Sequence, residues 1–211
     1  MPVDVKNSDA EKSYGGNFDI NYRATLLNNR ASISINQLFF YTRINGPLVL
    51  TELTNGYYKY LQPAGFTDTK GIEANVKLIY NHFKLFIGYT FAEVEQHYLT
   101  TTQFLLVARN RLNNVLMYEV EDKLKIGLEG YYYSRQKLND RTTGKSYWLC
   151  GFMAEKIWAR FSLFINFENI LDVRQTRFDA IYTGTITNPV FRDIYAPFDG
   201  LVMNGGIKIR L

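Results

Sequence analysis

The sequence predicts an all-β fold, an antiparallel up-and-down transmembrane β-barrel of which this chain supplies about nine to ten strands of a larger barrel. Three observations predict this fold. Apolar and polar residues alternate over many segments, which is the pattern of strands. The connections between these segments are alternately short and long. The 211 residues include 16 Tyr and 15 Phe but only 5 Pro, a composition that favours strands over helices.

The first two predicted strands form a hairpin. From Asn17 to Leu26, apolar residues occupy the even positions and polar residues the odd positions. Asn28-Asn29-Arg30 is a short polar turn, and the alternation resumes from Ile33 to Tyr41. Two strands joined by a tight turn are therefore expected.

The next segment, Tyr57 to Tyr80, contains a break around Pro63 and Gly65 and then alternates cleanly from Ile72 onward. We interpret it as one long strand with a bulge or kink. A hairpin at Thr67–Thr69 is the alternative interpretation.

The rest of the chain predicts six more strands, each of which begins where the alternation resumes. These strands cover Phe83–Phe91, Asn114–Val120, Leu124–Tyr132, Tyr147–Glu155, Phe161–Glu168 and Leu201–Leu211. The short turns are expected at Asn28–Arg30, Asn81–His82, Glu121–Lys123 and Lys156–Arg160. The long connections are Asn45–Gly56, Glu93–Asn113, Ser134–Lys145 and Asn169–Asp199. Up-and-down order then places all long connections at one end of the sheet. Residues 1–16 are a polar lead-in, and residues 17–211 form the barrel segment.

Charged residues gather on one face of the predicted strands. A water-filled lumen accepts such charges, whereas a Lys or Arg facing lipid at mid-depth costs about 2–4 kcal/mol. The polar face carries Asp19, Arg23, Glu73, Lys77, Lys84, Lys125, Glu129, Lys208 and Arg210. We expect the opposite set to point away from the barrel axis: Ile20, Tyr22, Ile35, Ala74, Val76, Leu85, Ile87, Ile126, Leu128, Leu163, Ile165 and Ile207. Periodicity does not distinguish inside from outside, so a soluble all-β binding or adhesion module with an apolar interior is the alternative.

Composition excludes several other classes. No window approaches the roughly 20 consecutive apolar residues of a membrane helix. The net charge of +4 is spread along the chain, without the basic block of a nucleic-acid partner. Cys150 is the one cysteine, so no disulfide framework is expected. No catalytic arrangement or phosphate-binding loop is present, and we expect neither an enzyme nor a resident cofactor or metal.

Two groups of residues are candidate substrate contacts. Glu93, Glu95 and His97 alternate, so in an extended segment all three project to one side, where they could contact a substrate or ligate a divalent metal. A solvated strand extension above the membrane is the favoured interpretation of these residues and requires no ligand. Arg174 and Arg177, in the last long connection, could pair with an anionic chelate, and loop solvation is the alternative explanation.

Five segments resemble the TonB-dependent outer-membrane receptors of Gram-negative bacteria, and they occur in the order that the family shows. The first resembles the entry into a barrel strand, the second a Gly-Ile-Glu strand opening, and the third the strand after a long external loop. The fourth resembles the segment before the last loop, and the fifth the closing strand. They are AEKSYGGNFDINY (Ala10 to Tyr22), KGIEANVKLIY (Lys70 to Tyr80), RLNNVLMYEV (Arg111 to Val120), FENILDVRQTR (Phe167 to Arg177) and GLVMNGGIKIRL (Gly200 to Leu211).

The resemblance implies the C-terminal barrel portion of a receptor that imports a scarce nutrient, such as an iron chelate, vitamin B12 or a glycan. It implies outer-membrane lipid and a small-molecule or chelate substrate as partners. The TonB system would be reached only through a plug domain, which has no counterpart in this sequence. A second departure is the final residue, which is usually aromatic in the family and is Leu211 here.

An odd number of strands has a consequence for the edges. Nine antiparallel strands leave the first and last strands parallel, so the sheet does not close on itself with antiparallel pairing. Open edges are not tolerated in lipid because unpaired backbone groups are costly there. We therefore expect the isolated chain not to transport anything.

Overall fold

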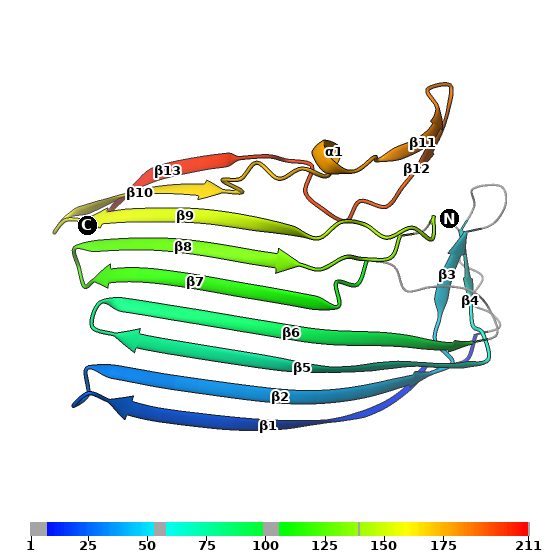
Figure 1. Cartoon of the computed structure of the whole chain (residues 1–211), viewed down its shortest axis with the longest axis horizontal. Coiled ribbons are helices and arrows are strands. Elements are labelled where there is room, and N and C mark those ends of the chain that lie inside the picture. Colours follow the sequence, from blue (N-terminus) through cyan, green and yellow to red (C-terminus); the bar gives the residue numbers. More distant parts are fainter. Residues whose placement is uncertain (1–7, 53–57, 99–105, 139, 211) are drawn as a thin grey trace.

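A computed structural model describes residues 8–52, 58–98, 106–138 and 140–210. Nine antiparallel strands form one sheet, the main sheet, in the order β1-β2-β5-β6-β7-β8-β9-β10-β13 (Figure 1). The strands are β1 (Lys12–Leu26), β2 (Ala31–Asn45), β5 (Gly65–Tyr80), β6 (Phe83–Tyr98), β7 (Asn110–Val120), β8 (Leu124–Tyr133), β9 (Tyr147–Ile157), β10 (Phe161–Glu168) and β13 (Val202–Ile209). The all-β, up-and-down prediction is confirmed.

The short turns and the long connections lie at opposite ends of the main sheet (Figure 1). Two connections contain small hairpins of their own, β3 (Val49–Glu52) with β4 (Tyr58–Leu61) and β11 (Tyr182–Thr185) with β12 (Asn188–Phe191). A single short helix, α1 (Gln175–Phe178), is found in the described residues. The predicted segregation of loop lengths is confirmed.

The tight turns use residues that tolerate a left-handed backbone. Asn28, Asn29, Asn81 and Asp122 have φ values of 51°, 67°, 50° and 55°. Asn and Asp adopt this region more readily than most side chains because they can hydrogen-bond to nearby backbone. The sequence therefore reverses the chain at these points within two to four residues.

The prediction of one strand from Tyr57 to Tyr80 is wrong. β4 ends at Leu61 and pairs with β3, whereas β5 begins at Gly65 and pairs with β2 and β6. Pro63 lies in the break, where its missing N–H prevents continued ladder pairing. Gly65 has a φ of 139°, and a Cβ there would lie 2.1 Å from the His97 carbonyl oxygen. Only glycine fits this position.

Two strand boundaries also differ from the prediction. The expected irregular connection Glu93–Asn113 is shorter, because β6 continues to Tyr98 and β7 begins at Asn110. Every residue of β6 from Phe83 to Tyr98 is paired with β5. β1 begins at Lys12, inside the segment assigned to the polar lead-in. Cross-strand pairing thus extends the sheet beyond the cleanly alternating sequence.

The register gives the main sheet two chemically different faces. Ile35, Val76 and Ile87 are direct neighbours on adjacent strands, as are Ser34, Lys77 and Phe86. We call the first the apolar face and the second the polar face. All twelve residues of the predicted apolar set lie on the apolar face by this register, and Ile20, Leu128 and Ile207 are at least half exposed.

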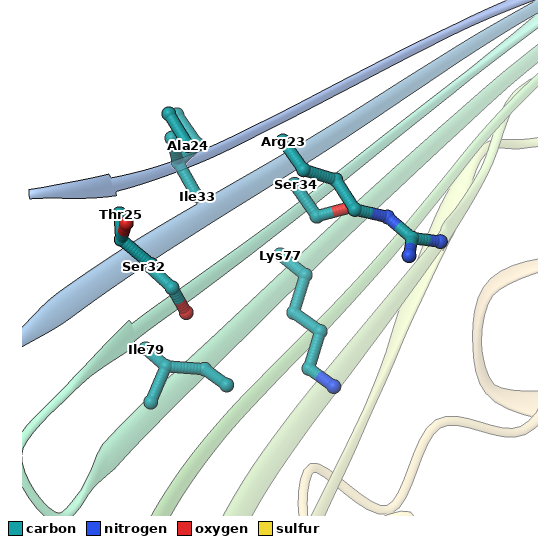
Figure 2. Close-up of a pocket in the computed structure, with 8 residues that line it drawn as sticks. All are labelled: Arg23, Ala24, Thr25, Ser32, Ile33, Ser34, Lys77 and Ile79. Atoms are coloured by element: carbon teal, nitrogen blue, oxygen red, sulfur yellow. The ribbon is translucent and has the colours of Figure 1, made fainter. Parts of the chain in front are cut away.

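A hollow of about 570 Å³ lies over β1, β2 and β5 (Figure 2). Most of its lining side chains, such as Arg23, Ser34 and Lys77, belong to the polar face, and Ala24 and Ile33 belong to the apolar face. Buried hydrophobic residues of the described chain are few and none belongs to the predicted apolar set: Ala108, Leu138, Ile157, Tyr195 and Ala196. The alternative of a soluble barrel with an apolar interior is therefore not favoured.

An uncharged band crosses the apolar face of β5 and β6. It extends from Ile72 to Tyr80 on β5 and from Phe83 to Phe91 on β6, nine residues in each case by the register. Lys70 and its cross-strand partner Glu93 follow at the long-loop end. A transmembrane strand needs about 9–11 residues, so the band has the height of a hydrocarbon layer. In the described residues, no helix has the length and apolarity needed to cross a membrane.

The first and last strands of the main sheet are its edges. β1 pairs with β2 and β13 with β10. Because all nine strands alternate in direction, β1 and β13 both run toward the short-turn end (Figure 1).

Substituting the centre of the uncharged band distinguishes the two faces. Val76→Arg places a cation on the apolar face, and Asn75→Arg places the same cation on the polar face. In a bilayer we expect V76R to lower the free energy of unfolding by about 2–4 kcal/mol, because the cation then faces lipid. N75R is the control and should cost less than half as much in urea unfolding. Equal losses for both variants would contradict the assignment of the faces.

Candidate functional site

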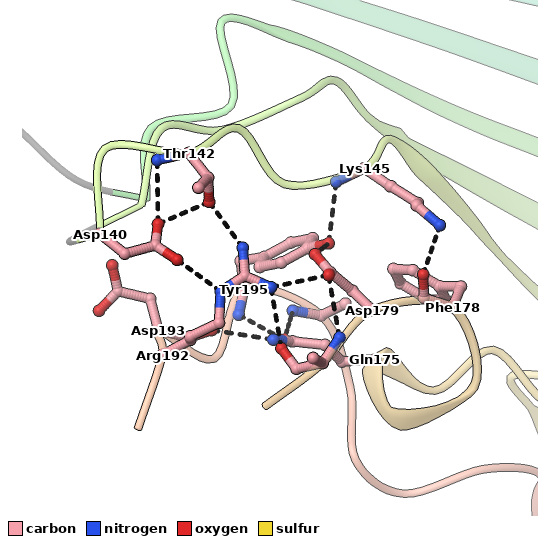
Figure 3. A network of polar contacts seen from close by, with 11 residues as sticks. Asp140, Thr142, Lys145, Gln175, Phe178, Asp179, Arg192, Asp193 and Tyr195 are labelled. Carbon is pink, nitrogen blue, oxygen red and sulfur yellow. Dashed lines mark hydrogen bonds and ion pairs between the residues drawn. The ribbon is translucent and has the colours of Figure 1, made fainter. Parts of the chain in front are cut away.

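The candidate functional site is a cluster of loop residues at the long-loop end of the main sheet. It joins the β8–β9 connection, residues 134–146, to the β10–β13 connection, residues 169–201 (Figure 3). Leu138, Tyr195 and Ala196 are its buried core, with Tyr147 and Phe178 packed against them. We call this group the loop cluster.

Gln175, the first residue of α1, is fully buried in the loop cluster. Its Nε2 donates to the Asp193 carbonyl oxygen at 2.9 Å. Its Oε1 accepts from the backbone N–H groups of Tyr195 at 2.8 Å and Ala196 at 3.1 Å. Burying an amide is costly unless its polar atoms form hydrogen bonds. Gln175 therefore holds in place the backbone segment from Asp193 to Ala196, which precedes β13.

Tyr195 forms hydrogen bonds through its side-chain hydroxyl, which links the two connections, and through its backbone carbonyl oxygen. Its hydroxyl donates to Asp179 Oδ2 at 2.6 Å and accepts from the Lys145 backbone N–H at 2.8 Å. The Tyr147 hydroxyl donates to the Tyr195 carbonyl oxygen at 2.8 Å. Burial, followed by the neighbouring Asp179 carboxylate, raises the pKa of Tyr195 to about 12. The phenol therefore stays protonated and remains a donor at physiological pH.

Arg192 is the cation of the loop cluster, with one-tenth of its side chain exposed. Its Nε lies 2.6 Å from Asp140 Oδ2 and its Nη1 lies 2.8 Å from Asp179 Oδ1. Nη2 donates to Thr142 Oγ1 at 2.6 Å. A planar guanidinium suits such a fork of acceptors. The ion pair with Asp140 bridges residues that are 52 positions apart in the chain.

The carboxylates around Arg192 are held ionised. The hydrogen bond from the Thr142 side chain, more than any other cause, lowers the pKa of Asp140. Burial alone would raise the pKa of Asp179, but the hydrogen bond from Tyr195 and the Arg192 guanidinium outweigh it and lower that pKa. Both carboxylates therefore accept hydrogen bonds throughout the neutral range.

Arg174 and Arg177, the predicted anion contacts, lie in the same connection beside Asp172. Arg174 Nε is 2.7 Å from Asp172 Oδ1, and Arg177 Nη2 is 2.6 Å from Asp172 Oδ2. The hydrogen bond from Arg174 is the largest cause that lowers the pKa of Asp172. The structure thus brings both arginines together at the long-loop end, with a carboxylate between them.

Glu93, Glu95 and His97 lie elsewhere, on β6 and on the same face as the apolar band. Glu93 pairs with Lys70 and Arg109, and Glu95 pairs with Lys70. The His97 ring stacks on Phe66 with its centroid 4.4 Å away. β7, β8 and β9 separate this group from the β10–β13 connection. In the part of the chain that is described, no group of three His, Cys, Asp or Glu side chains is arranged to hold a metal ion.

The residues that organise the loop cluster have no local signal in the sequence. Gln175, Arg192 and Tyr195 occur in a polar connection without periodicity. Their partners Asp140 and Lys145 lie in a different connection. Only the length of these two connections pointed to this end of the molecule.

Comparisons with known proteins identify the fold. No protein-family profile and no curated protein sequence matches this chain. Solved structures do match. The FrpB iron transporter from Neisseria meningitidis (F3-3 variant) has a TM-score of 0.63 at 13% identity over 95% of this chain and 30% of its own. The ferripyoverdine receptor of the outer membrane of Pseudomonas aeruginosa has a TM-score of 0.57 at 18% identity over 92% of this chain and 27% of its own.

A third similar structure is the siderophore receptor PirA from Acinetobacter baumannii, with a TM-score of 0.58 at 15% identity over 77% of this chain and 28% of its own. The chain thus spans less than a third of the length of these receptors. Its fold is that of a portion of the barrel of TonB-dependent receptors.

Removing the guanidinium should loosen the loop cluster. Arg192→Gln leaves Asp140 and Asp179 without their cation, and we expect amide exchange of Lys145 to accelerate about tenfold or more. Lys145 reports on coupling because it bonds to Tyr195 and not to Arg192. Arg135→Gln, an exposed arginine of the same connection, is the control. Unchanged exchange in R192Q would show that the ion pairs do not hold the cluster.

Acid should release the same loops. The folded pKa values of Asp140 and Asp179 lie below the ordinary 3.8, so their stabilisation is complete above that pH and is lost as pH falls through the folded values. We expect protection of the Lys145 amide, measured by exchange after correction for the intrinsic rate, to fall below about pH 3.8. Protection that stays constant down to pH 2 would contradict the assigned role of the carboxylates.

Proposed function

We propose that this chain is part of the wall and of the external loops of an outer-membrane receptor for a scarce nutrient in a Gram-negative bacterium. The chain supplies nine strands and the loop cluster, and acts as a binding and transport component rather than as an enzyme. The partners are membrane lipid and a small-molecule substrate. TonB would act through a plug domain, as in the receptors that the sequence resembles, and not by direct contact with this wall. Nucleic acid is not among the proposed partners.

The observation that carries the proposal is the uncharged band, nine residues long on β5 and on β6, on an exposed apolar face. Ile20, Leu128 and Ile207 are large apolar residues on that face with half or more of their surface exposed. In water such a surface would drive aggregation, whereas in lipid it is stabilising. A soluble binding or adhesion module would bury these residues, so the alternative is not favoured.

Of the three substrate classes that the resemblance implies, iron chelates, vitamin B12 and glycans, we propose an iron chelate. The similar solved structures include an iron transporter and siderophore receptors. Arg174 and Arg177 lie at the long-loop end, where a substrate arriving from outside lands first. Both are only partly buried, so their remaining donors can reach an anionic chelate. The proposal assigns Glu93, Glu95 and His97 to the ion-paired strand extension.

Surface labelling tests the proposed location and orientation. In a Cys150→Ala background of the polypeptide that carries this sequence, Ile186→Cys places a thiol at the long-loop end, where Ile186 is 88% exposed. Glu121→Cys places one in a short turn. On intact Gram-negative cells a membrane-impermeant maleimide should label the first and spare the second until the outer membrane is opened. The reverse pattern, or equal labelling of both, would overturn the orientation.

The substrate contacts have their own test. We expect Arg174→Gln combined with Arg177→Gln to weaken binding of a ferric catecholate about tenfold, because two charge-assisted contacts are lost. Arg135→Gln is the matched control and should bind as the unmodified protein does. Equal affinities for all three proteins would exclude the two arginines as chelate contacts.

A further inference from the structure

A group of charged side chains lies directly beyond the uncharged band, on the same face and at the long-loop end. Lys70 and Glu93 are cross-strand partners in the first row after the band, and Glu95 follows one row further along β6. Arg109 precedes β7, and its guanidinium carbon lies 5.5 Å from the centroid of the Phe91 ring, where the band ends. We call these four charged residues, Lys70, Glu93, Glu95 and Arg109, the charged rim.

The first row of the charged rim has the depth of lipid headgroups. A bilayer is about 30 Å thick in its hydrocarbon core and about 40–45 Å thick with its headgroups, so each headgroup layer is about 5–8 Å thick. Lys70 lies two residues beyond Ile72, which is about 7 Å along the strand and about 5 Å along the membrane normal at a strand tilt of about 45°. This placement rests on the proposed function, in which the uncharged band spans the hydrocarbon.

The cations of the first row are its most accessible groups. Glu93 lies between Lys70 and Arg109 and pairs with both. The side chains of Lys70 and Arg109 are 47% and 55% exposed, whereas that of Glu93 is 20% exposed. Glu95, which is 43% exposed, lies one row further from the band. A headgroup at the level of the first row therefore meets two cations before the carboxylate that joins them.

The charged rim stays accessible in a complete barrel. β5 has paired strands on both sides, β2 and β6, and β6 lies between β5 and β7. Neither strand is an edge of the main sheet, so additional strands would be added elsewhere. The apolar face points away from the lumen in the proposed function, so a plug domain would lie on the other side of the wall. The exposure of the two cations thus does not depend on parts of the barrel outside this chain.

We propose that Lys70 and Arg109 bind the phosphate of a membrane lipid whose acyl chains lie against the uncharged band. An ammonium has three donors and a guanidinium five, and the pairs with Glu93 and Glu95 use only part of them. Phosphate oxygens suit both groups as acceptors. A lipid is the occupant rather than a free phosphate, because Ile72 and its neighbours offer an apolar surface to its chains within one row of the cations.

Lipid retention, measured by native mass spectrometry, tests this proposal. The polypeptide that carries this sequence is purified in detergent micelles and mixed with equal amounts of phosphatidic acid and of a diacylglycerol with the same acyl chains but no phosphate. The unmodified protein should retain phosphatidic acid in preference. This preference should fall about three- to tenfold in Lys70→Gln and in Arg109→Gln, because each loses one charge-assisted contact. Lys77→Gln is the control, because it removes an equal charge from the polar face of the same strand.

Glu93→Gln separates lipid binding from ion-pair stability. This variant removes the carboxylate that competes with the phosphate for both cations, so the preference for phosphatidic acid should rise about threefold or more. If the charged rim served only to hold β5 and β6 together, E93Q, K70Q and R109Q would all lower the urea midpoint of unfolding and leave the lipid preference unchanged. That result would overturn the proposal.

The remaining outcomes are equally decisive. A loss of preference in K77Q as large as in K70Q would mean that only net charge matters, and equal retention of both lipids by the unmodified protein would remove the site. Displacement of phosphatidic acid by an equimolar amount of inorganic phosphate would replace the lipid by a free anion. None of these results depends on the labelling of intact cells, so a failure here is distinguishable from a failure of the proposed outer-membrane orientation.

Discussion

The antiparallel register of the main sheet is the constraint on which the other features depend. In a bilayer, backbone N–H and C=O groups have no water to bond with, so each strand must be paired along its length. Pairing in turn fixes parity, because a shift by one residue would exchange the two faces. Val76 lies between Ile35 and Ile87 on the apolar face, and Lys77 lies between Ser34 and Phe86 on the polar face. Shifting β5 by one position would turn Lys77 toward lipid.

The paired strands of the main sheet and the loop cluster at its end are built in different ways. The buried hydrophobic cluster of the described residues lies in the loop cluster, around Leu138 and Tyr195, and not between the strands. In the loop cluster, polar contacts such as Arg192 with Asp140 join connections that are distant in sequence. A rigid sheet with an independently packed cluster at one end can present loop side chains to a ligand without strain in the strands.

Much of the sheet could be predicted because alternation is a local property. Asn28 and Asn81 mark turns, and period-two patterns mark faces, without any knowledge of partners. Other features depend on contacts between distant segments. The continuation of β6 to Tyr98 follows from pairing with β5, and β4 is separated from β5 because it pairs with β3 instead. The candidate site was harder still, because Arg192 is recognisable only once Asp140 and Asp179 are placed beside it.

The most direct test of the account is to ask which face of β6 meets lipid. Single nitroxide labels placed in turn from Phe83 to Phe91, in the protein reconstituted into a bilayer, report collisions with oxygen, which concentrates in lipid, and with a water-soluble nickel complex. The account predicts oxygen maxima at the odd positions, which include Leu85, Ile87 and Tyr89, and nickel maxima at the even positions. Opposite phases, or high nickel access at both faces, would contradict a lipid-facing apolar band.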